Sequence, residues 1–187
     1  MAQHFFGYGS LVNRTTHGYG RAHRASVTGW RRMWRHTAGH PYAVLTAHPA
    51  PGARIEGLVA EVPGGDWAAL DAREAGYRRH PLAPPDLAHE APHPVAAQIY
   101  AVPPEAEAPL TRPVLLSYLD VVLQGYLREF GPAGAERFMA TTDGWSAPVL
   151  NDRARPRYPR HRTLTGDEAA TVDALLASVA ARVLPAD

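Results

Sequence analysis

The chain has 187 residues, with 19 basic against 18 acidic side chains and a formal net charge of +1. It contains no cysteine, and every basic side chain is arginine, which excludes thiolate metal sites, thiol nucleophiles, lysine Schiff bases and a P-loop lysine. Near-neutral charge argues against a dedicated nucleic-acid binder, and the absence of an 18-residue apolar run or signal-peptide start predicts a cytoplasmic protein without a membrane segment.

The first half of the chain predicts a sheet. Short apolar and β-branched runs, separated by Gly, Pro and His, predict strands over Gln3–Phe6, His23–Val27, Trp30–Arg35, Tyr42–Ala47 and Ile55–Val62. Asp66 is suited to cap a short helix over Trp67–Glu74, which Gly76 ends. Residues Tyr77–Leu82 and Val95–Val102 return to the sheet on either side of a proline-rich loop. Strands this close together in sequence favour an antiparallel or mixed sheet.

The second half of the chain predicts helices. Apolar side chains recur at helical spacing from Pro113, which suits a first turn, to a stop at Gly131-Pro132. A short helix over Ala133–Ala140 and a final helix over Asp167–Val183 follow. Because neither half has a self-sufficient core, residues 1–187 are expected to form a single α+β domain, with a compact sheet or small barrel first and helices packed on it.

Two familiar motifs occur without the context that their chemistry needs. His89-Glu90-Ala91-Pro92-His93 matches H-E-x-x-H, in which both histidines bind zinc from one helix face. Pro92 and Pro94 make a continuous helix there unlikely to form, so no metal site is expected. Gly7-Tyr8-Gly9 begins like a dinucleotide fingerprint, but Val12 stands at the third glycine position and no helical pattern opens there. We therefore expect no cofactor.

One stretch of the chain is locally basic. It contains five arginines within ten residues, namely Arg153, Arg155, Arg157, Arg160 and Arg162. A block of like charges is more often a solvated loop than a phosphate-binding track, and a nucleic-acid binder would show steeply salt-dependent affinity. The prediction is therefore that nucleic acid is not a partner.

Two places in the sequence are candidates for chemistry. Ser10 is not in a G-x-S-x-G context, so its glycine-rich turn is better suited to hold an anion with backbone N–H groups than to supply a nucleophile. Glu74 lies at the end of the predicted short helix, where the helix dipole disfavours a negative charge. That position indicates a role outside the helix. A surface ion pair with Arg73, Arg78 or Arg79 is an equally good interpretation.

At these two places the sequence resembles the γ-glutamylcyclotransferase superfamily. Phe6–Val12 looks like the family's Y-G-S-L/N loop, and Leu70–Glu74 looks like its L-D-x-x-E element. Between them, Val27–Arg32 resembles a V-x-G-Y/W-R-R strand and Ile55–Val59 an I-x-G-x-V/L strand. Each motif alone is weak, but four in the right order within about the first 80 residues are specific together.

The resemblance implies a small mixed β-barrel with flanking helices and an intramolecular aminolysis that needs no cofactor. A γ-glutamyl unit would close to 5-oxoproline and release an amino acid or amine, with Glu74 as catalytic general acid and base. Burial by apolar neighbours such as Tyr77 and Trp67 would raise the pKa of Glu74. The resemblance also implies that the small-molecule substrate is held by Gly7, Tyr8, Gly9, Ser10, Leu11, Val12 and Tyr118.

Several alternatives stay open at this stage. Tyr126 competes with Tyr118 as the downstream substrate contact. The γ-glutamyl substrate could be glutathione, as in the ChaC-type enzymes, or a γ-glutamylamine, and a non-catalytic γ-glutamyl-binding module is a less favoured reading. The segment Thr141–Arg160 has no recognised counterpart and is either a lid or subfamily-specific loop or the packing of Trp145. The sequence leaves the oligomeric state open.

Overall fold

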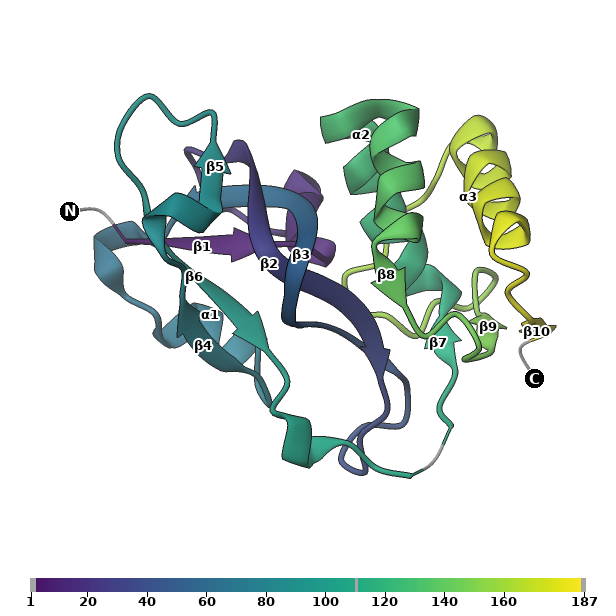
Figure 1. Ribbon diagram of the computed structural model, residues 1–187. Coiled ribbons are helices and arrows are strands. Elements are labelled where there is room, and N and C mark those ends of the chain that lie inside the picture. Colours follow the sequence, from purple (N-terminus) through teal and green to yellow (C-terminus); the bar gives the residue numbers. More distant parts are fainter. Residues whose placement is uncertain (1–2, 110, 186–187) are drawn as a thin grey trace.

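The computed structural model describes residues 3–109 and 111–185 as a strand-rich half and a helical half that pack together (Figure 1). The main sheet has the order β4-β6-β1-β3-β2-β5, with β8 paired to β2. Its strands are β1 (Gln3–Gly7), β2 (His23–Arg35), β3 (Val44–Glu61), β4 (Arg78–Pro81), β5 (Leu87–His89), β6 (Ala96–Ala101) and β8 (Thr142–Asp143). A smaller parallel sheet joins β7 (Val114–Leu115), β9 (Val149–Asn151) and β10 (Val183–Pro185).

The α+β prediction is confirmed, but the sheet does not close into a barrel. Most pairs are antiparallel, with β1 parallel to β6 and β2 parallel to β8. Within the described residues the sheet path ends at β4 on one side and β5 on the other. Both end strands are short, and Pro81 lies in one while Pro84 and Pro85 precede the other. Proline has no N–H to donate to a further ladder, so Pro81 limits further pairing at the β4 edge.

Two predicted strand breaks are wrong, because β2 and β3 each run through them. β2 continues past Gly29, which adopts φ +82° at a register shift between Thr28 and Trp30. Across from it, residues 50–53 of β3 fit between the pairs Thr28–Arg54 and Trp30–Pro49. The Pro- and Gly-containing stretch is therefore a bulge inside a long strand, since bulged residues need no ladder partner.

The helices are close to the prediction but begin and end differently. α1 spans Ala68–Arg73, with the Asp66 carboxylate accepting the Ala68 N–H at 3.0 Å. α2 spans Leu116–Ala140 and is kinked at Gly131 (φ +69°), where the sequence predicts a break. It starts three residues after Pro113 because Val114–Leu115 pair with β9 instead. α3 spans Gly166–Ser178 with a Thr165–Glu168 capping box, and the chain beyond it forms β10 rather than more helix.

One continuous apolar core joins the two halves. Phe5, Phe6 and Leu58 from the sheet and Leu119 and Tyr126 from α2 are fully buried in it. α2 lies between the sheet and α3 (Figure 1). Within the described residues, no helix combines the length and apolar character that crossing a membrane requires.

Candidate active site

The glycine-rich loop leaves the end of β1 and forms a tight 3₁₀ turn, η1 (Ser10–Val12). The turn is held by the Val12 N–H donating to the Gly9 carbonyl at 2.9 Å. Gly9 has to be small, because a Cβ atom there would lie 2.8 Å from the Tyr118 hydroxyl oxygen. A Cβ on Gly7 would lie 2.6 Å from the Leu11 Cβ. The glycines thus allow the loop to fold tightly against a side chain from α2.

Glu74 caps the C-terminal end of α1, and its side chain turns toward this loop. Its N–H still completes the last helical bond to Leu70, and its carbonyl accepts the Tyr77 N–H at 2.9 Å. The side chain is 18% exposed, and one carboxylate oxygen lies 3.4 Å from Arg73 Nε. Arg78 and Arg79 instead pair with Glu105 and Asp71. Glu74 is therefore a largely buried carboxylate whose ion-pair contact is with the largely buried Arg73 side chain, not part of a surface ion pair.

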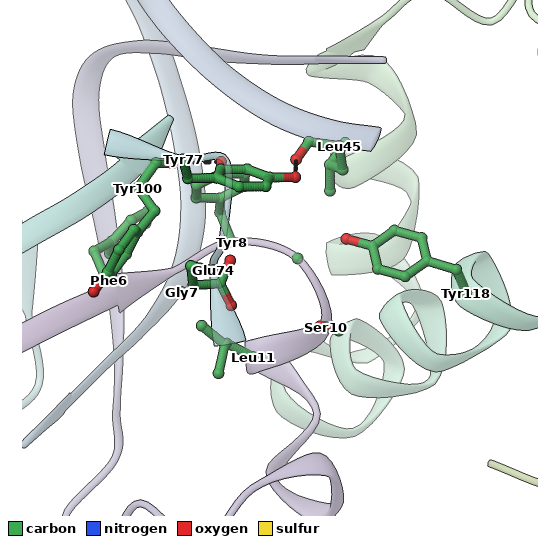
Figure 2. A pocket seen from close by; sticks show the side chains of 11 residues that line it. Phe6, Gly7, Tyr8, Ser10, Leu11, Leu45, Glu74, Tyr77, Tyr100 and Tyr118 are labelled. Atoms are coloured by element: carbon green, nitrogen blue, oxygen red, sulfur yellow. Dashed lines mark hydrogen bonds between the residues drawn. The ribbon is translucent and has the colours of Figure 1, made fainter. Parts of the chain in front are cut away.

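An inner pocket brings the two sequence candidates together (Figure 2). Its lining includes Gly7, Tyr8, Gly9, Ser10 and Leu11 from the loop, Glu74, and Tyr118 from α2, with Phe6, Leu45, Tyr77 and Tyr100. Figure 2 shows the Glu74 carboxylate and the Tyr118 hydroxyl on opposite sides of the loop. Val12 does not line this pocket and is fully buried in the core beneath it. Trp67 also lies elsewhere, against Gln3 and Arg79.

The tyrosines of the inner pocket use their hydroxyls differently. Tyr8 donates to the Tyr100 carbonyl at 2.6 Å and accepts the Ala47 N–H at 3.1 Å. Tyr77 donates to the Leu45 carbonyl at 2.8 Å, and Tyr100 donates to the Asp71 carboxylate at 2.6 Å. These three hydroxyls are committed to the scaffold, so their residues contribute rings and backbone to the pocket.

The structure distinguishes the two downstream tyrosines by position. Tyr118 lines the pocket, and its ring is packed edge-on against Trp34 and Tyr158 at centroid distances of 6.0 and 5.0 Å. Tyr126 lies further along α2 and is fully buried. Its hydroxyl donates to the Glu56 carbonyl at 2.6 Å and accepts from the Arg32 guanidinium at 2.7 Å. Tyr118 alone of the two can contact a molecule in the pocket.

Burial shapes the protonation of this site. Burial raises the pKa of Glu74 above its usual value, although Arg73 and Arg160 oppose that change by favouring the charged form. Burial also raises the pKa of Tyr118 well above its usual value, with the Ser10 N–H beside the hydroxyl opposing it. At neutral pH the pocket thus holds neutral tyrosines around one carboxyl group that is easier to protonate than a surface glutamate.

A larger outer cavity of about 400 Å³ opens from the inner pocket. The two share Ser10, Leu45, Glu74, Tyr77 and Tyr118, so they are continuous. The outer walls add His40, Tyr42, Arg73, Arg157, Tyr158 and Arg160, among others. Its far wall comes from the segment after β9, about 80 residues from Glu74 in sequence.

The two ends of the segment Thr141–Arg160 have different surroundings in the structure. Its start packs structurally: Trp145 donates to the Met139 carbonyl at 3.1 Å and lies 5.7 Å from the Trp34 ring. Its end, at Arg157–Arg160, lines the outer cavity. Of the other basic side chains in this stretch, Arg153 forms ion pairs with Asp120 and Asp173.

The H-E-x-x-H and Gly7-Tyr8-Gly9 segments differ from helical motifs in their local structure. His89 ends strand β5 and His93 lies in the following loop, so the H-E-x-x-H residues do not share a helix. Among residues 3–109 and 111–185, no group of three or more His, Asp or Glu side chains is arranged to hold a metal ion. The Gly7-Tyr8-Gly9 turn opens a 3₁₀ turn of three residues, not the helix of a dinucleotide-binding unit.

The comparison with known families agrees with the geometry of the inner pocket. A family model described as "Gamma-glutamyl cyclotransferase, AIG2-like" matches residues 5–118, more than half of the chain. The chain belongs to this family. The matched range contains every residue that lines the inner pocket and ends at Tyr118. It leaves out Arg157, Tyr158 and Arg160 of the outer cavity.

Solved structures of this fold extend the likeness beyond the matched range. A structure titled "Gamma-glutamyl cyclotransferase" aligns with a TM-score of 0.57 at 13% identity, covering 93% of this chain and 99% of that one. An uncharacterized human protein aligns with a TM-score of 0.57 at 15% identity, over 92% and 98%. YkqA from Bacillus subtilis aligns with a TM-score of 0.59 at 18% identity, over 76% of this chain.

These likenesses concern the fold. The alignment covers 56% of YkqA, so this chain corresponds to about half the length of that protein. No curated protein sequence gives a significant match to the chain.

Proposed function

We propose that this protein is a γ-glutamyl cyclotransferase that converts a γ-glutamyl unit to 5-oxoproline and releases an amino acid or amine, with Glu74 as its general acid and base. One observation carries the proposal: a buried carboxylate and a tight glycine-rich loop line the same pocket within a chain of this family. A base and donors for a developing oxyanion must meet on one substrate, and the proposal is supported because the residues assigned to both roles line this pocket.

The reaction is a rearrangement within one molecule. The α-amino nitrogen of the γ-glutamyl unit attacks its own side-chain carbonyl carbon, and the new C–N bond closes a five-membered lactam. The bond between that carbon and the leaving nitrogen then breaks. The α-ammonium loses two protons in becoming the lactam N–H, and the leaving nitrogen gains two in departing as an ammonium, so the protons balance and no water, metal or nucleotide is consumed.

Glu74 is the group proposed to move these protons. As a carboxylate it takes a proton from the α-ammonium, which frees the lone pair of the amine to attack, and as a carboxylic acid it returns a proton to the leaving nitrogen. A surface glutamate is a weak base at neutral pH, with a pKa of about 4.3. Because burial raises the pKa of Glu74, its basicity is closer to what the task needs. Activity is expected to fall as pH drops through that raised pKa, since the base becomes protonated.

The loop and Tyr118 are proposed to shape the substrate. The backbone N–H groups of Gly9, Ser10 and Leu11 belong to residues that line the pocket, and they would hold the substrate carboxylate or the tetrahedral oxyanion. Tyr118 lies against this loop, where its hydroxyl can contact the same group. A folded-back glutamyl chain places its amine near its own carbonyl, which is the orientation that cyclisation requires.

The decisive experiment follows 5-oxoproline release from γ-glutamyl-alanine, γ-glutamyl-ε-lysine and glutathione. Glu74→Gln keeps the size of the side chain and removes the base, so turnover should fall by roughly 10²–10⁴. The matched control is Glu61→Gln on β3, a glutamate paired with Arg21 outside both cavities. The control should keep wild-type turnover.

Each outcome assigns the site differently. Wild-type 5-oxoproline release from a folded Glu74→Gln protein would remove Glu74 from the mechanism. Binding of γ-glutamyl compounds without release of 5-oxoproline by the wild type would identify a binding module and overturn the proposal.

A further inference from the structure

We propose that the outer cavity is a recognition site for an anionic group on the leaving part of the substrate, with Arg157 and Arg160 as its specificity-determining residues. The inference rests on the proposed function and adds the substrate class to it. Among γ-glutamyl compounds it selects those whose leaving amine carries a carboxylate or phosphate over neutral or cationic amines.

The position of the cavity sets what it contacts. A γ-glutamyl unit held between the loop and Glu74 fills the inner pocket, so the atoms beyond its γ-carbonyl have to extend away from the loop. The outer cavity shares Glu74, Ser10 and Tyr118 with the inner pocket, so it is the adjoining space into which those atoms can extend. With about 400 Å³, it has room for the leaving part of the substrate.

The charged side chains of the outer walls are mostly positive. Three arginines line the cavity, and Glu74 is the only carboxylate among its lining residues. Arg73 is committed to the fold, because it donates to the Thr16 carbonyl at 3.1 Å and lies beside Glu74. Among the described residues, no carboxylate lies within ion-pair distance of Arg160, although the charge of Arg160 acts to lower the pKa of Glu74. Arg157 contacts the Tyr42 hydroxyl at 3.3 Å at the exposed rim.

The arginines are carried on a segment that the fold holds in place. The fully buried Asp152 carboxylate accepts from the Ser117 N–H at 2.8 Å, the Ser117 hydroxyl at 2.6 Å and the Arg157 N–H at 2.8 Å. The Tyr158 N–H donates to the same hydroxyl at 3.2 Å. These bonds tie the segment to the first turn of α2, next to Tyr118. The guanidinium groups are thus presented from a fixed backbone, which favours selective binding.

A fixed arginine cluster distinguishes ligands by charge. Guanidinium groups bind carboxylate and phosphate through strong charge-assisted hydrogen bonds, and like charges repel. An anionic leaving amine gains these bonds, a neutral one does not, and a cationic one meets three positive charges. The expected preference for the anionic over the neutral substrate is about ten- to a hundredfold in kcat/KM.

The test uses substrates whose leaving amines differ in charge, with alanine and alaninamide as the closely matched pair. We would compare kcat/KM for 5-oxoproline release from γ-glutamyl-alanine, γ-glutamyl-alaninamide, γ-glutamyl-phosphoethanolamine and γ-glutamyl-ethylenediamine. The wild type should prefer the two anionic substrates, and the better of those two identifies the anion as carboxylate or phosphate. Arg160→Gln should bring the ratio of acid to amide close to one by lowering turnover of the acid alone. Arg160→Glu should favour the ethylenediamine substrate.

A neighbouring arginine provides the matched control. Arg155 lies in the same segment, is exposed and does not line the cavity, so Arg155→Gln should leave the ratio unchanged. A variant that merely folds poorly lowers turnover of acid and amide together and leaves their ratio intact. Arg157→Gln serves as the second variant with the same expected direction as Arg160→Gln.

The outcomes separate the two proposals. If 5-oxoproline forms but the wild type treats acid and amide alike, or Arg160→Gln and Arg157→Gln both keep the wild-type ratio, the inference is wrong while the proposed function stands. If no substrate releases 5-oxoproline, the proposed function fails and the inference fails with it.

Discussion

The inner pocket and the outer cavity meet at Glu74 but are built from different parts of the chain. The inner pocket takes all its lining residues from the range that matches the family, and most of its side chains are uncharged. The outer cavity takes a wall from the segment after β9 and is lined by three arginines. One region is tight, aromatic and nearly neutral, whereas the other is wider and cationic.

This contrast fits a division of labour under the proposed function. Cyclisation involves only the γ-glutamyl unit, so any enzyme of this type needs the same inner arrangement of base and loop. The leaving part differs from one substrate to another, and it would extend toward the wall that the family match leaves out. Changes to the inner pocket should therefore reduce turnover of every substrate, and changes to the outer wall should alter selectivity among substrates.

After Glu74→Gln, the sharpest test of the inner pocket is a substitution that adds a single methyl group to the glycine-rich loop. Gly9→Ala places a Cβ atom 2.8 Å from the Tyr118 hydroxyl oxygen and 3.3 Å from Leu45 Cδ2. The Tyr118 ring is packed between Trp34 and Tyr158, so the loop has to shift instead. A displacement of about 1 Å can cost about 10²-fold, and kcat/KM should fall to that degree for all γ-glutamyl substrates alike.

A double substitution checks the cause of that loss. Tyr118→Phe removes the oxygen that the new methyl group would meet, so Gly9→Ala combined with Tyr118→Phe should be no worse than Tyr118→Phe alone. Gly18→Ala is the matched control, because a Cβ at Gly18 has no atom within 4 Å. Additive losses in the double variant would show that the clash is not the cause.

The outer wall is tested through its anchor, with a smaller expected effect. Asp152→Asn removes the charge and one acceptor from a fully buried group that holds the first turn of α2 and the backbone of Arg157. The free energy of unfolding should fall by about 1–3 kcal/mol, the cost of disturbing buried charge-assisted hydrogen bonds. Urea denaturation measures this loss of stability. In steady-state kinetics, KM for an anionic substrate should rise by a larger factor than kcat falls.

An exposed aspartate that pairs with the neighbouring Arg153 is the control for this change. Asp173 binds Arg153 with its side chain 59% exposed, so Asp173→Asn should cost about 0–1 kcal/mol and leave KM unchanged. Equal effects of the two substitutions would contradict a special anchoring role for Asp152.

The sequence predicts the fold where local patterns decide it and misses what distant segments decide. The strand into the glycine loop, the helix before Glu74 and the kink at Gly131 follow from turn and cap chemistry. The start of α2 does not, because Val114 pairs with β9 about 35 residues away. The bulge opposite Gly29 is also decided by pairing, which lets proline and glycine stay inside a strand.

The candidate site divides in the same way. Glu74 and the loop residues Gly7 to Leu11 lie within motifs, so the sequence alone predicts them as candidate site residues. Arg157 and Arg160 stand out only as part of a basic run, and nothing local shows that they turn toward Glu74. The one available signal was Asp152 directly before that run, but its partner Ser117 is known only once α2 is placed.

The smallest expected effect is the change in the free energy of unfolding that the buried Glu74 carboxylate causes. Since burial raises the pKa of Glu74, the folded protein binds its proton more tightly than the unfolded chain does. Stability contributed by this group is therefore present below the unfolded pKa of about 4.3 and is lost as pH rises through the folded pKa. Glu74→Gln carries no charge, so at pH 8 it should be more stable than the wild type by about 0.5–2 kcal/mol, the usual range for stabilising substitutions.

Urea denaturation of both proteins at pH 8 and pH 4 measures this difference, with Glu61→Gln as the control. The gain should shrink at pH 4, where most of the Glu74 carboxyl groups are protonated in both states. If Glu74→Gln is instead less stable at pH 8, the attraction of Arg73 and Arg160 outweighs burial, and Glu74 is a structural ion-pair partner. A gain in stability together with a loss of turnover would mean that the charge of Glu74 serves catalysis, because it destabilises the folded protein.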